Sequence, residues 1–454
     1  MTEYQSWGRY PRVGEGEQKA LRLSWAHEIP RLRGLPGSLL PRGLGRSYGD
    51  SCLNPGGTLL DARGLDRFIS FDEESGLLCC EAGASFEEIL RVFVPKGWFL
   101  PTTPGTKFVT VGGAIANDVH GKNHHLSGSF GAHVRRFELL TSDGRRRVCS
   151  RAQNAALFHA TIGGLGLTGL ITWAEFPLMP IATSAMASEN IKTRDLGEFF
   201  ELSEASEADW PFIVSWVDMT ARGRGLGRGL FNRGRWHGSS PSPLASAEPG
   251  GGPLQASPEP KLRFPFDLPS FALNPLSIRA FNALYYAKQL GRVKRGIAHY
   301  EPFFYPLDAI LDWNRGYGKR GFIQWQCLVP MEGAKQSIRR ILEAAASSGL
   351  GSPVSVMKTS GAMPAQGLLS FMRLRGITLA LDFPMSGQPV LDLCQRLDAL
   401  VRDAGGCVYP GKDARMSGES FKAFFPQWRR FASFVDPKLS SGFWRRVMGA
   451  AKES

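Results

Sequence analysis

The sequence predicts an α+β protein of two domains. Its 454 residues exceed the usual length of a single domain. Apolar residues make up 43% of the chain, which is enough to bury sizeable cores. Short strand-like runs alternate with helix-like segments, a pattern typical of α+β architecture rather than of a barrel or a helix bundle.

Region 35–180 contains most of the strand-like runs, each bounded by Gly, Pro or Asp. They are "TLLDA", "FISFD", "LLCCEAG", "FELLTSDG", "RRVCS" and "TGLITWAEFPL". Between them, "SFEEILRVFVPKG" predicts a helix with Ser85 as its N-cap, Glu88 at the capping-box position and Gly97 beyond its end. We therefore expect a first α+β domain here.

A second region follows, roughly over residues 185–406. It contains the strand-like runs "FIQWQCLVP" and "ITLALDFPM". Its helix-like runs, "AKQSIRRILEAAASSG" and "PVLDLCQRLDALVRDAGG", each end at glycine, as a C-cap should. This pattern predicts a sheet backed by helices. Residues 238–260, "GSSPSPLASAEPGGGPLQASPEP", contain too little apolar surface to become ordered, so we expect a disordered insert.

The net charge of +13 suits an anionic partner: nucleic acid, a membrane surface or a phosphorylated molecule. The chain contains no zinc-finger, basic-zipper or RNP1 pattern, so we expect no nucleic-acid partner. The Arg/Gly run "RGRGLGRGLFNRGR" at 222–235 is similar to RNA-binding tails. We interpret it instead as a mobile loop near an anionic partner.

The compartment is predicted from the cysteines and the N-terminus. Seven cysteines without metal-ligand spacing indicate free thiols in a reducing environment. The first twenty residues lack an apolar signal region, and no apolar run is long enough to cross a membrane. We expect a cytoplasmic protein.

Two glycine-rich stretches are candidate ligand loops. "GGLGLTG" at 163–169 has dinucleotide-fingerprint spacing, but that fingerprint needs a strand before it and a helix after it. The flanking residues predict the reverse order, so we reject a Rossmann site. In "PRGLGRSYGD" at 41–50, the backbone N–H groups, with Arg42 or Arg46, suit a phosphate nest. An ordinary glycine-rich turn is the alternative there.

The stretch "VGGAIANDVHGKNHH" at 111–125 contains three histidines. His120 and His124 are four residues apart, but Gly121 disfavours the helix that would bring them together, and Lys122 would repel a cation. We therefore predict no metal site. Gly112 and Gly113 would let the backbone approach a planar or anionic group closely.

Several motifs follow one another in a fixed order: "RGLGRSYGD", "PGT", "VGGAIAND", "HGKNHH", "LTSDG" and "GGLGLTGLI". This order resembles the PCMH-type FAD-binding domain of the vanillyl-alcohol-oxidase-like flavoproteins. Within that group, "HGKNHH" with "RSYGD" is similar to the decaprenylphosphoryl-β-D-ribose 2-oxidase family. The likeness includes "WGR" (7–9), "FFYPLDAILDWNRGYGKRGFIQWQCLVP" (303–330), "YPGKDARMSGESFKAFFP" (409–426) and "VDPKL" (435–439).

The resemblance implies a two-domain flavoprotein. Residues 1–184, completed by 407–454, would form the FAD-binding domain, and 185–406 a substrate-binding domain with an antiparallel sheet backed by helices. Loop 41–51 would bind the FAD pyrophosphate, and 111–125 would lie against the flavin. The positions implied to contact FAD are Arg42, Gly43, Leu44, Gly45, Arg46, Ser47, Tyr48, Gly49, Gly105, Thr110, Val111, Gly112, Gly113, Asn117, Asp118, Val119, His120, Ile171 and Tyr409.

Many relatives with this fold bind flavin covalently through a histidine in the first loop. Ser47 occupies that position here, so we expect non-covalent, dissociable FAD.

The implied reaction is oxidation of a ribofuranose 2-hydroxyl on a polyprenyl-phosphate carrier, with hydride passing from sugar C2 to flavin N5. Lys412, in "YPGKDAR", matches an active-site lysine of the family. It is implied to bind the substrate oxygen or to stabilise negative charge at the flavin N1/C2 carbonyl. His120, Lys122, Gln326 and Lys358 are implied to line the same cavity, and the choice of base among these residues stays open.

The implied partners are a polyprenyl-phosphate-linked sugar, an NAD(P)H-dependent short-chain reductase that completes epimerisation to the arabinose form, and a peripheral membrane surface. The apolar-rich segment "RFPFDLPSFALNPL" (263–276) suits a mobile loop near such a surface.

The chain departs from the family in two places. The family strand "NICVDFP" reads "TLALDFP" here, so Thr378 and Ala380 replace an asparagine and an inhibitor-reactive cysteine. Asn117 stands where a small or thiol residue is expected. The FAD assignment is therefore firmer than the exact substrate. A flavin-dependent oxidase or dehydrogenase of another sugar, alditol or aldonolactone is one alternative, and a non-enzymatic basic RNA- or membrane-binding protein is another.

Overall fold

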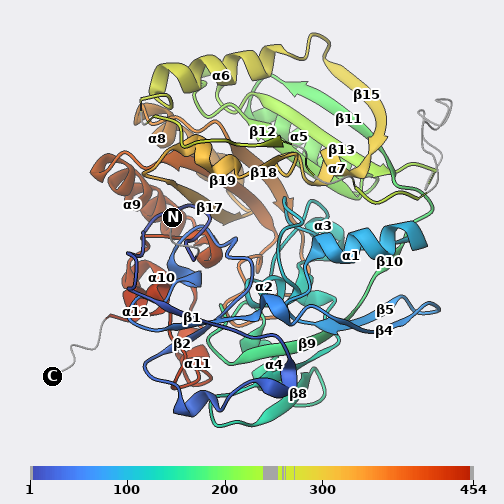
Figure 1. Ribbon diagram of the computed structural model, residues 1–454. Helices are drawn as coiled ribbons and strands as arrows, with labels where there is room; N and C mark the ends of the chain where they lie inside the picture. Colours follow the sequence, from blue (N-terminus) through green and yellow to red (C-terminus); the bar gives the residue numbers. More distant parts are fainter. Residues whose placement is uncertain (1–3, 239–253, 258–259, 261, 270, 450–454) are drawn as a thin grey trace.

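The structure, a computed structural model, describes residues 4–238, 254–257, 260, 262–269 and 271–449. Two bodies are stacked in Figure 1. Strands from the first 180 residues lie in the lower body, and one large sheet with its helices forms the upper body. No helix within the described ranges is both long and apolar enough to span a membrane.

Two larger sheets and the short pair β10-β6 make up the sheet structure described in the lower body. A parallel sheet has the order β1-β3-β2, and a five-stranded antiparallel sheet has the order β4-β5-β9-β7-β8. Their bounds are β1 Lys19–Arg22, β2 Leu39–Arg42, β3 Thr58–Asp61, β4 Phe68–Asp72, β5 Leu77–Glu81, β7 Arg136–Leu140, β8 Arg146–Ser150 and β9 Leu170–Pro177. These strands confirm the six strand-like runs predicted in this region.

Three helices accompany these sheets: α1 (Phe86–Phe93), α2 (Val111–Ala116) and α4 (Ala155–Thr161). The predicted capping box of α1 is present, because Ser85 Oγ accepts from the Glu88 N–H and the Glu88 carboxylate accepts from the Ser85 N–H. Gly97, at φ 83°, ends the short turn after α1. Helix α4 precedes the glycine turn 163–169 and strand β9 follows it, which confirms the rejection of a Rossmann fingerprint.

The upper body is one eight-stranded sheet of order β15-β11-β13-β12-β18-β19-β17-β20. The bounds are β11 Ala185–Thr193, β12 Phe212–Val217, β13 Gly229–Trp236, β15 Val293–His299, β17 Phe322–Pro330, β18 Ser355–Ser360, β19 Gly376–Pro384 and β20 Cys407–Val408. Every pair is antiparallel. Helices α5 (Leu196–Ser206), α8 (Ala334–Ser347) and α9 (Gln388–Asp403) pack on one face and bury the larger core.

The remaining elements are short, apart from α6 (Pro275–Ala287), which lies over the upper sheet in Figure 1. They are α3 His124–Ser127, α7 Tyr300–Phe304, α10 Gly418–Phe424, α11 Trp428–Ala432, α12 Gly442–Met448, β6 Trp98–Phe99, β10 Met179–Pro180, β14 Leu262–Arg263 and β16 Ile310–Leu311. After β20, the chain returns to the lower body, where Leu39 N–H donates to Lys438 O.

The interpretation of 222–235 as a mobile loop is wrong. Its second half is strand β13, in the middle of the large sheet between β11 and β12. Phe231 and Trp236 are buried, and the arginines have partners: Arg228 pairs with Asp218, and Arg233 with Glu189. The strand lacks an apolar alternation because Phe231 is buried on one face and Trp236 on the other, so its sequence did not indicate a strand.

Most of the predicted disordered insert lies outside the described residues, over 239–253. Its end does not fit the prediction, because Leu254 packs against the core beside α1 and Ser257 Oγ donates to the Tyr300 hydroxyl. Within the described part of segment 263–276, Asp267 forms ion pairs with Arg9 and Arg315, which tie this part of the predicted loop to the protein.

Candidate active site

A cavity of about 910 Å³ lies between the two bodies. Its wall on the lower side consists of loop 41–48, residues 103–106 and helix α2 with the following loop. Its wall on the upper side consists of side chains from the eight-stranded sheet and from the turn at Lys412. The two walls meet at His120.

The lower wall is largely backbone. Thr110 caps α2, its Oγ1 accepting from the Gly113 N–H at 3.1 Å. A Cβ on Gly43 would lie 2.2 Å from that same Oγ1, so only glycine lets loop and helix approach this closely. Gly45 has φ +64°, which also favours glycine. In the part of the chain that the structure describes, no backbone N–H of residues 43–47 donates a hydrogen bond within the protein.

Most of the residues implied to contact FAD line this cavity. They are Arg42, Gly43, Leu44, Gly45, Arg46, Ser47, Tyr48, Gly105, Thr110, Gly112, Gly113, Asn117, Val119, His120, Ile171 and Tyr409. The five residues implied for catalysis, Lys412, His120, Lys122, Gln326 and Lys358, line it as well.

Three implied FAD contacts do not lie on the cavity wall. Gly49 packs against the backbone of Asp413, and a Cβ there would lie 1.8 Å from the Asp413 carbonyl oxygen. Val111 belongs to the core beside α1. The carboxylate of Asp118 is turned inward, where it accepts from Ser129 Oγ at 2.7 Å, Ser370 Oγ and the Gly131 N–H. These residues support the wall from behind.

His120 lies where the two walls meet. Its Nε2 is 3.0 Å from Gln326 Nε2, which also donates to Thr378 Oγ1 at 2.8 Å. Burial lowers the pKa of His120 well below its usual range, and Lys358 and Lys412 lower it further. A neutral imidazole therefore accepts from the Gln326 amide and carries its proton on Nδ1. Within the described residues, that Nδ1 has no hydrogen-bond partner.

Three half-buried lysines line the cavity: Lys122 in the loop after α2, and Lys358 and Lys412 on the upper wall. Burial lowers the pKa of Lys122 to about 8, and its Nζ donates to Phe304 O at 2.9 Å. Burial, followed by repulsion from Lys412 and Lys122, lowers the pKa of Lys358 well below its usual range. Such a cluster stabilises anionic groups that enter the cavity.

Lys412 faces a buried carboxyl that sequence reasoning missed. Burial lowers the pKa of Lys412 and raises that of Asp382, and each charge partly opposes the shift of the other. Asp382 is fully buried and accepts from Gln324 Nε2 at 2.5 Å and from the Tyr317 hydroxyl at 3.2 Å. Ala380, two residues earlier on the same strand, faces the cavity. The sequence around Asp382 gave no sign that its carboxyl would be buried next to Lys412.

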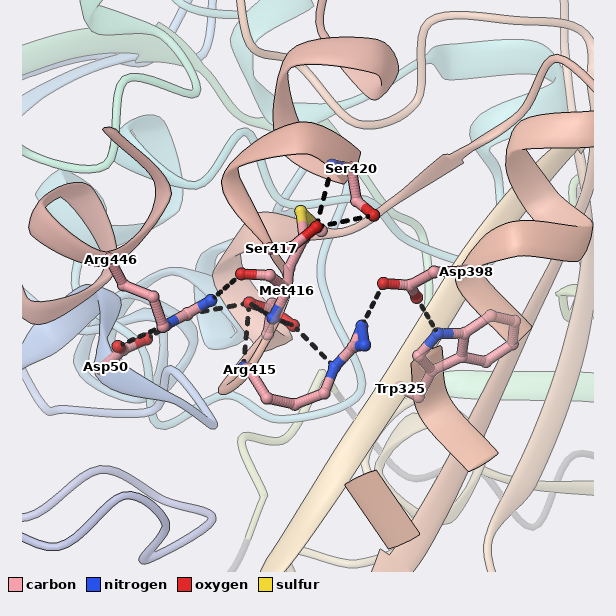
Figure 2. A network of polar contacts seen from close by, with 9 residues as sticks. Asp50, Trp325, Asp398, Arg415, Met416, Ser417, Ser420 and Arg446 are labelled. Carbon is pink, nitrogen blue, oxygen red and sulfur yellow. Dashed lines mark hydrogen bonds and ion pairs between the residues drawn. The ribbon is translucent and has the colours of Figure 1, made fainter. Parts of the chain in front are cut away.

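A buried ion-pair network fixes the turn that carries Lys412 (Figure 2). Arg446 of α12 reaches Asp50 at 2.7 Å, just after the first loop, and Asp413 at 2.9 Å, next to Lys412. Arg415 pairs with Asp398 of α9, which also accepts from Trp325 Nε1 of β17 at 2.9 Å. The network ties both walls of the cavity to helix α12. Its charged residues lie far apart in the sequence, so no local motif revealed it.

The histidines of 111–125 do not meet as a metal site. His124 Nδ1 lies 3.2 Å from both Ser360 Oγ and Gly361 N, and His125 Nε2 is 3.0 Å from Trp210 O. No cluster of three or more His, Cys, Asp or Glu suited to a metal ion occurs among the described residues.

The wall residues fit FAD. The free N–H groups of 43–47 form a nest for a diphosphate. A Cβ added at Gly105 would meet no protein atom within 4 Å, so that backbone faces open space in the cavity. The partnerless Nδ1 of His120 and Oε1 of Gln326 leave polar atoms for a bound ring.

Comparisons with known proteins agree with this geometry. A family model of the FAD binding domain matches residues 18–150. Decaprenylphosphoryl-β-D-ribose oxidase of Mycolicibacterium smegmatis is 36% identical over 405 residues, which cover 88% of this chain and 86% of that relative. The chain belongs to the decaprenylphosphoryl-β-D-ribose oxidase family. It is an FAD-dependent oxidoreductase with an α+β, PCMH-type fold.

Two further relatives extend the comparison. An uncharacterized protein in the mprA 5' region of Streptomyces coelicolor is 32% identical over 376 residues, which cover 80% of this chain and 99% of that relative. Cytokinin dehydrogenase 7 of Oryza sativa subsp. japonica is 28% identical over 199 residues, only 40% of this chain and 37% of its own length. The family relationship therefore includes both walls of the cavity.

Proposed function

We propose that the protein oxidises the 2-hydroxyl of a polyprenylphosphoryl-β-D-ribofuranose to a ketone. The observation that carries this proposal is the 36% identity with decaprenylphosphoryl-β-D-ribose oxidase over both walls of the cavity. The cluster of Lys122, Lys358 and Lys412 supports it, because a sugar phosphate is anionic.

Bound FAD supplies the acceptor, at flavin N5, for the hydride that leaves sugar C2. The protein's own groups position the sugar and manage the hydroxyl proton. Lys412, whose pKa burial lowers to about 8, accepts the hydroxyl proton in its neutral form, and the Asp382 carboxyl stabilises the ammonium that results. The Gln326 amide, held between His120 and Thr378, fixes the sugar orientation.

FAD is held without a covalent bond in this proposal, because Ser47 cannot form the tether that a histidine forms. The purified protein should be yellow, and acid precipitation should release the flavin bands into the supernatant. Bands that stay with the pellet would contradict this point. A colourless protein that takes up no FAD would contradict the enzymatic proposal as a whole.

Anaerobic bleaching of the flavin tests the substrate class. We expect a polyprenylphosphoryl ribose to bleach it, whereas alditols and aldonolactones should not. The second candidate function is oxidation of another sugar, alditol or aldonolactone, and Thr378 and Ala380 favour it, since these two residues differ from the family strand. Bleaching by one of those compounds, and not by the ribose lipid, would select it.

The keto sugar needs a second enzyme if the product is the arabinose epimer. An NAD(P)H-dependent short-chain reductase would deliver hydride to the opposite face of C2. Incubation of the oxidised product with such a reductase and NADPH should give the arabinose form, and return of the ribose form alone would contradict this partner.

The substrate lipid implies peripheral association with a membrane. The exposed residues on and beside α6 include Phe271, Leu276, Leu284 and Leu290, with exposed fractions of 76%, 78%, 72% and 96%. Arg279, Arg292 and Arg295 lie on the same segment. Apolar side chains beside basic ones suit the surface of an anionic bilayer.

We expect Leu276→Ser/Leu290→Ser to reduce sedimentation with phosphatidylglycerol vesicles while FAD stays bound. Unchanged sedimentation would contradict this surface.

A further inference from the structure

The cavity continues far beyond the residues implied for catalysis. It follows the face of the eight-stranded sheet that α5, α8 and α9 leave uncovered. Cross-strand partners line it in one row: Gln326 on β17, Ala380 on β19, Val356 on β18, Trp216 on β12 and Leu230 on β13. Since side chains alternate between faces, this register places all five on the same side.

The polarity of the lining side chains changes along this row. Its catalytic end, at Gln326 and Lys358, is polar. Beyond Lys358, Val356, Val214, Trp216 and Leu230 form an apolar stretch, which ends at Asn232 opposite Val214. The resulting groove is about 10 Å wide across β18, β12 and β13, at ~4.8 Å per strand.

Helix α6 covers this apolar stretch. Tyr285 lies over Trp216 with ring centroids 4.7 Å apart, and Phe281 stacks on Tyr285 at 5.9 Å. Asn282 anchors the helix by donating to Asp218 and to Ser352 O at 3.1 and 3.2 Å. The Tyr286 hydroxyl donates to Thr193 O at 3.0 Å. The cover over the groove is therefore fixed to the sheet by hydrogen bonds.

The far end of the groove is polar again. Asn232 Nδ2 donates to Asn190 Oδ1 at 2.8 Å, and Gln289 Nε2 donates to Asn190 O at 3.0 Å. Lys288 and Lys294 lie beside them. Asn190 is four strands from Ala380, ~19 Å away. A phosphate bonded directly to a sugar at the flavin end cannot reach that far, so it lies near Lys358, one strand from Ala380.

We propose that the groove formed by Val214, Trp216, Leu230, Val356, Phe281 and Tyr285 binds the first isoprene units of the lipid carrier. This inference rests on the proposed function and specifies which protein surface recognises the lipid. The chain enters the groove directly after the phosphate. It leaves across α6, because the hydrogen-bonded polar end beyond Leu230 excludes a hydrocarbon.

The test compares two ribofuranosyl phosphate esters that differ only in the alcohol, farnesyl and methyl, without membranes. Val214→Trp fills the groove, and Phe281→Arg places a charge in it. Leu284→Arg is the matched control, since it puts the same charge on α6 outside the cavity lining. Phe281 is 48% exposed, so its replacement leaves the core intact even where Val214→Trp disturbs folding.

We expect both groove variants to raise KM for the farnesyl ester by roughly tenfold to a hundredfold, the loss expected when two to four carbons are no longer buried. KM for the methyl ester, the FAD content and both constants of Leu284→Arg should stay unchanged. Equal KM values of the wild type for the two esters, or equal losses for both esters in the variants, would overturn the groove while leaving the proposed function intact.

If neither ester reduces the flavin, the proposed function fails, and calorimetry with farnesyl phosphate alone then decides on the groove. Binding that is lost in both groove variants and kept in Leu284→Arg supports the proposal. No binding to the wild type, or the same binding in all variants, overturns it.

Discussion

The two walls of the cavity are built in different ways. The lower wall presents backbone from Gly43, Gly45, Gly112 and Gly113, whereas the upper wall presents side chains such as Gln326 and Lys358 from separate strands. A backbone wall suits a cofactor that is held by N–H groups and close approach. A side-chain wall suits a substrate that must be told apart from its relatives. In the proposed function, the lower body would therefore bind the cofactor and the upper body would select the substrate.

The largest effect should come from cutting the link between the walls. In Arg446→Met, the buried carboxylates of Asp50 and Asp413 lose their shared partner, at a cost of about 3–5 kcal/mol in the free energy of unfolding. Chemical denaturation and the FAD dissociation constant measure it. Arg429→Met, on the neighbouring helix α11, is the control.

The pH dependence of that loss has a definite sign. Burial raises the pKa of Asp413, but Arg446 and Arg415 outweigh it, so the pKa lies below the usual 3.8. A carboxyl group whose pKa is lower in the folded state stabilises the fold at pH values above its unfolded pKa. This stabilisation is lost as the pH falls through the folded pKa. The deficit of Arg446→Met should therefore be largest near neutral pH and shrink in acid. A deficit independent of pH would contradict the assignment.

A second test separates the walls by kinetics. Lys412→Met should slow flavin reduction about 10²–10³-fold, the usual cost of removing one group that stabilises developing charge. FAD should stay bound, because the backbone wall is intact. Stopped-flow absorbance measures the rate, and Lys422→Met on α10 is the matched control. A rate within a few-fold of wild type would remove Lys412 from the chemistry.

The backbone wall has its own test at Gly105. An added Cβ meets no protein atom within 4 Å, so Gly105→Ala should leave the stability of the apoprotein unchanged. The same methyl group points into the cavity and should weaken FAD binding about tenfold, or ~1.4 kcal/mol. Gly296→Ala, equally free of contacts but outside the cavity, should change neither. Unaltered FAD affinity in Gly105→Ala would show that Gly105 does not face the cofactor.

The smallest expected effect is proton uptake at Lys358 when an anionic phosphate ester binds. Burial and neighbouring lysines lower the pKa of Lys358 well below its usual range, so its amine loses its proton more readily than that of a free lysine. An anionic phosphate raises that pKa, so binding of the methyl phosphate ester should take up a fraction of a proton. Calorimetry in Tris and HEPES buffers measures the uptake, and Lys358→Met should reduce it. Proton release on binding would contradict this charge state.

Local signals could be interpreted from the sequence because they act over a few residues. The capping box at Ser85 and Glu88 is confirmed. Spacing alone marked the glycine-rich loop 41–50 only as a candidate phosphate nest, with an ordinary turn as the alternative, and the resemblance implied its contact with FAD. The strand β13 was misassigned, since glycine and arginine outnumber its apolar residues, and Phe231 and Trp236 are buried on opposite faces and therefore form no alternating pattern.

The side-chain wall could be reached only partly, through resemblance at Gln326, Lys358 and Lys412. The groove row is spread over five strands between Leu230 and Ala380, and only the register of the sheet makes neighbours of them. Asp382 and Arg446 were missed for the same reason. A buried charge is recognisable by its partners, which lie tens to hundreds of residues away.

The ion-pair network at Asp50 and Asp413 also has a consequence during protein synthesis, because its α12 residue, Arg446, is made late. The loop at 41–48 leaves the ribosome early, but the arginine that orders the segment behind it comes some four hundred residues later. Until residue 446 has emerged, Asp50 lacks the counter-charge of Arg446, and Asp413 pairs with Arg415 alone. The turn that carries Lys412 is therefore held to the segment behind loop 41–48 only after nearly the whole described chain has been made.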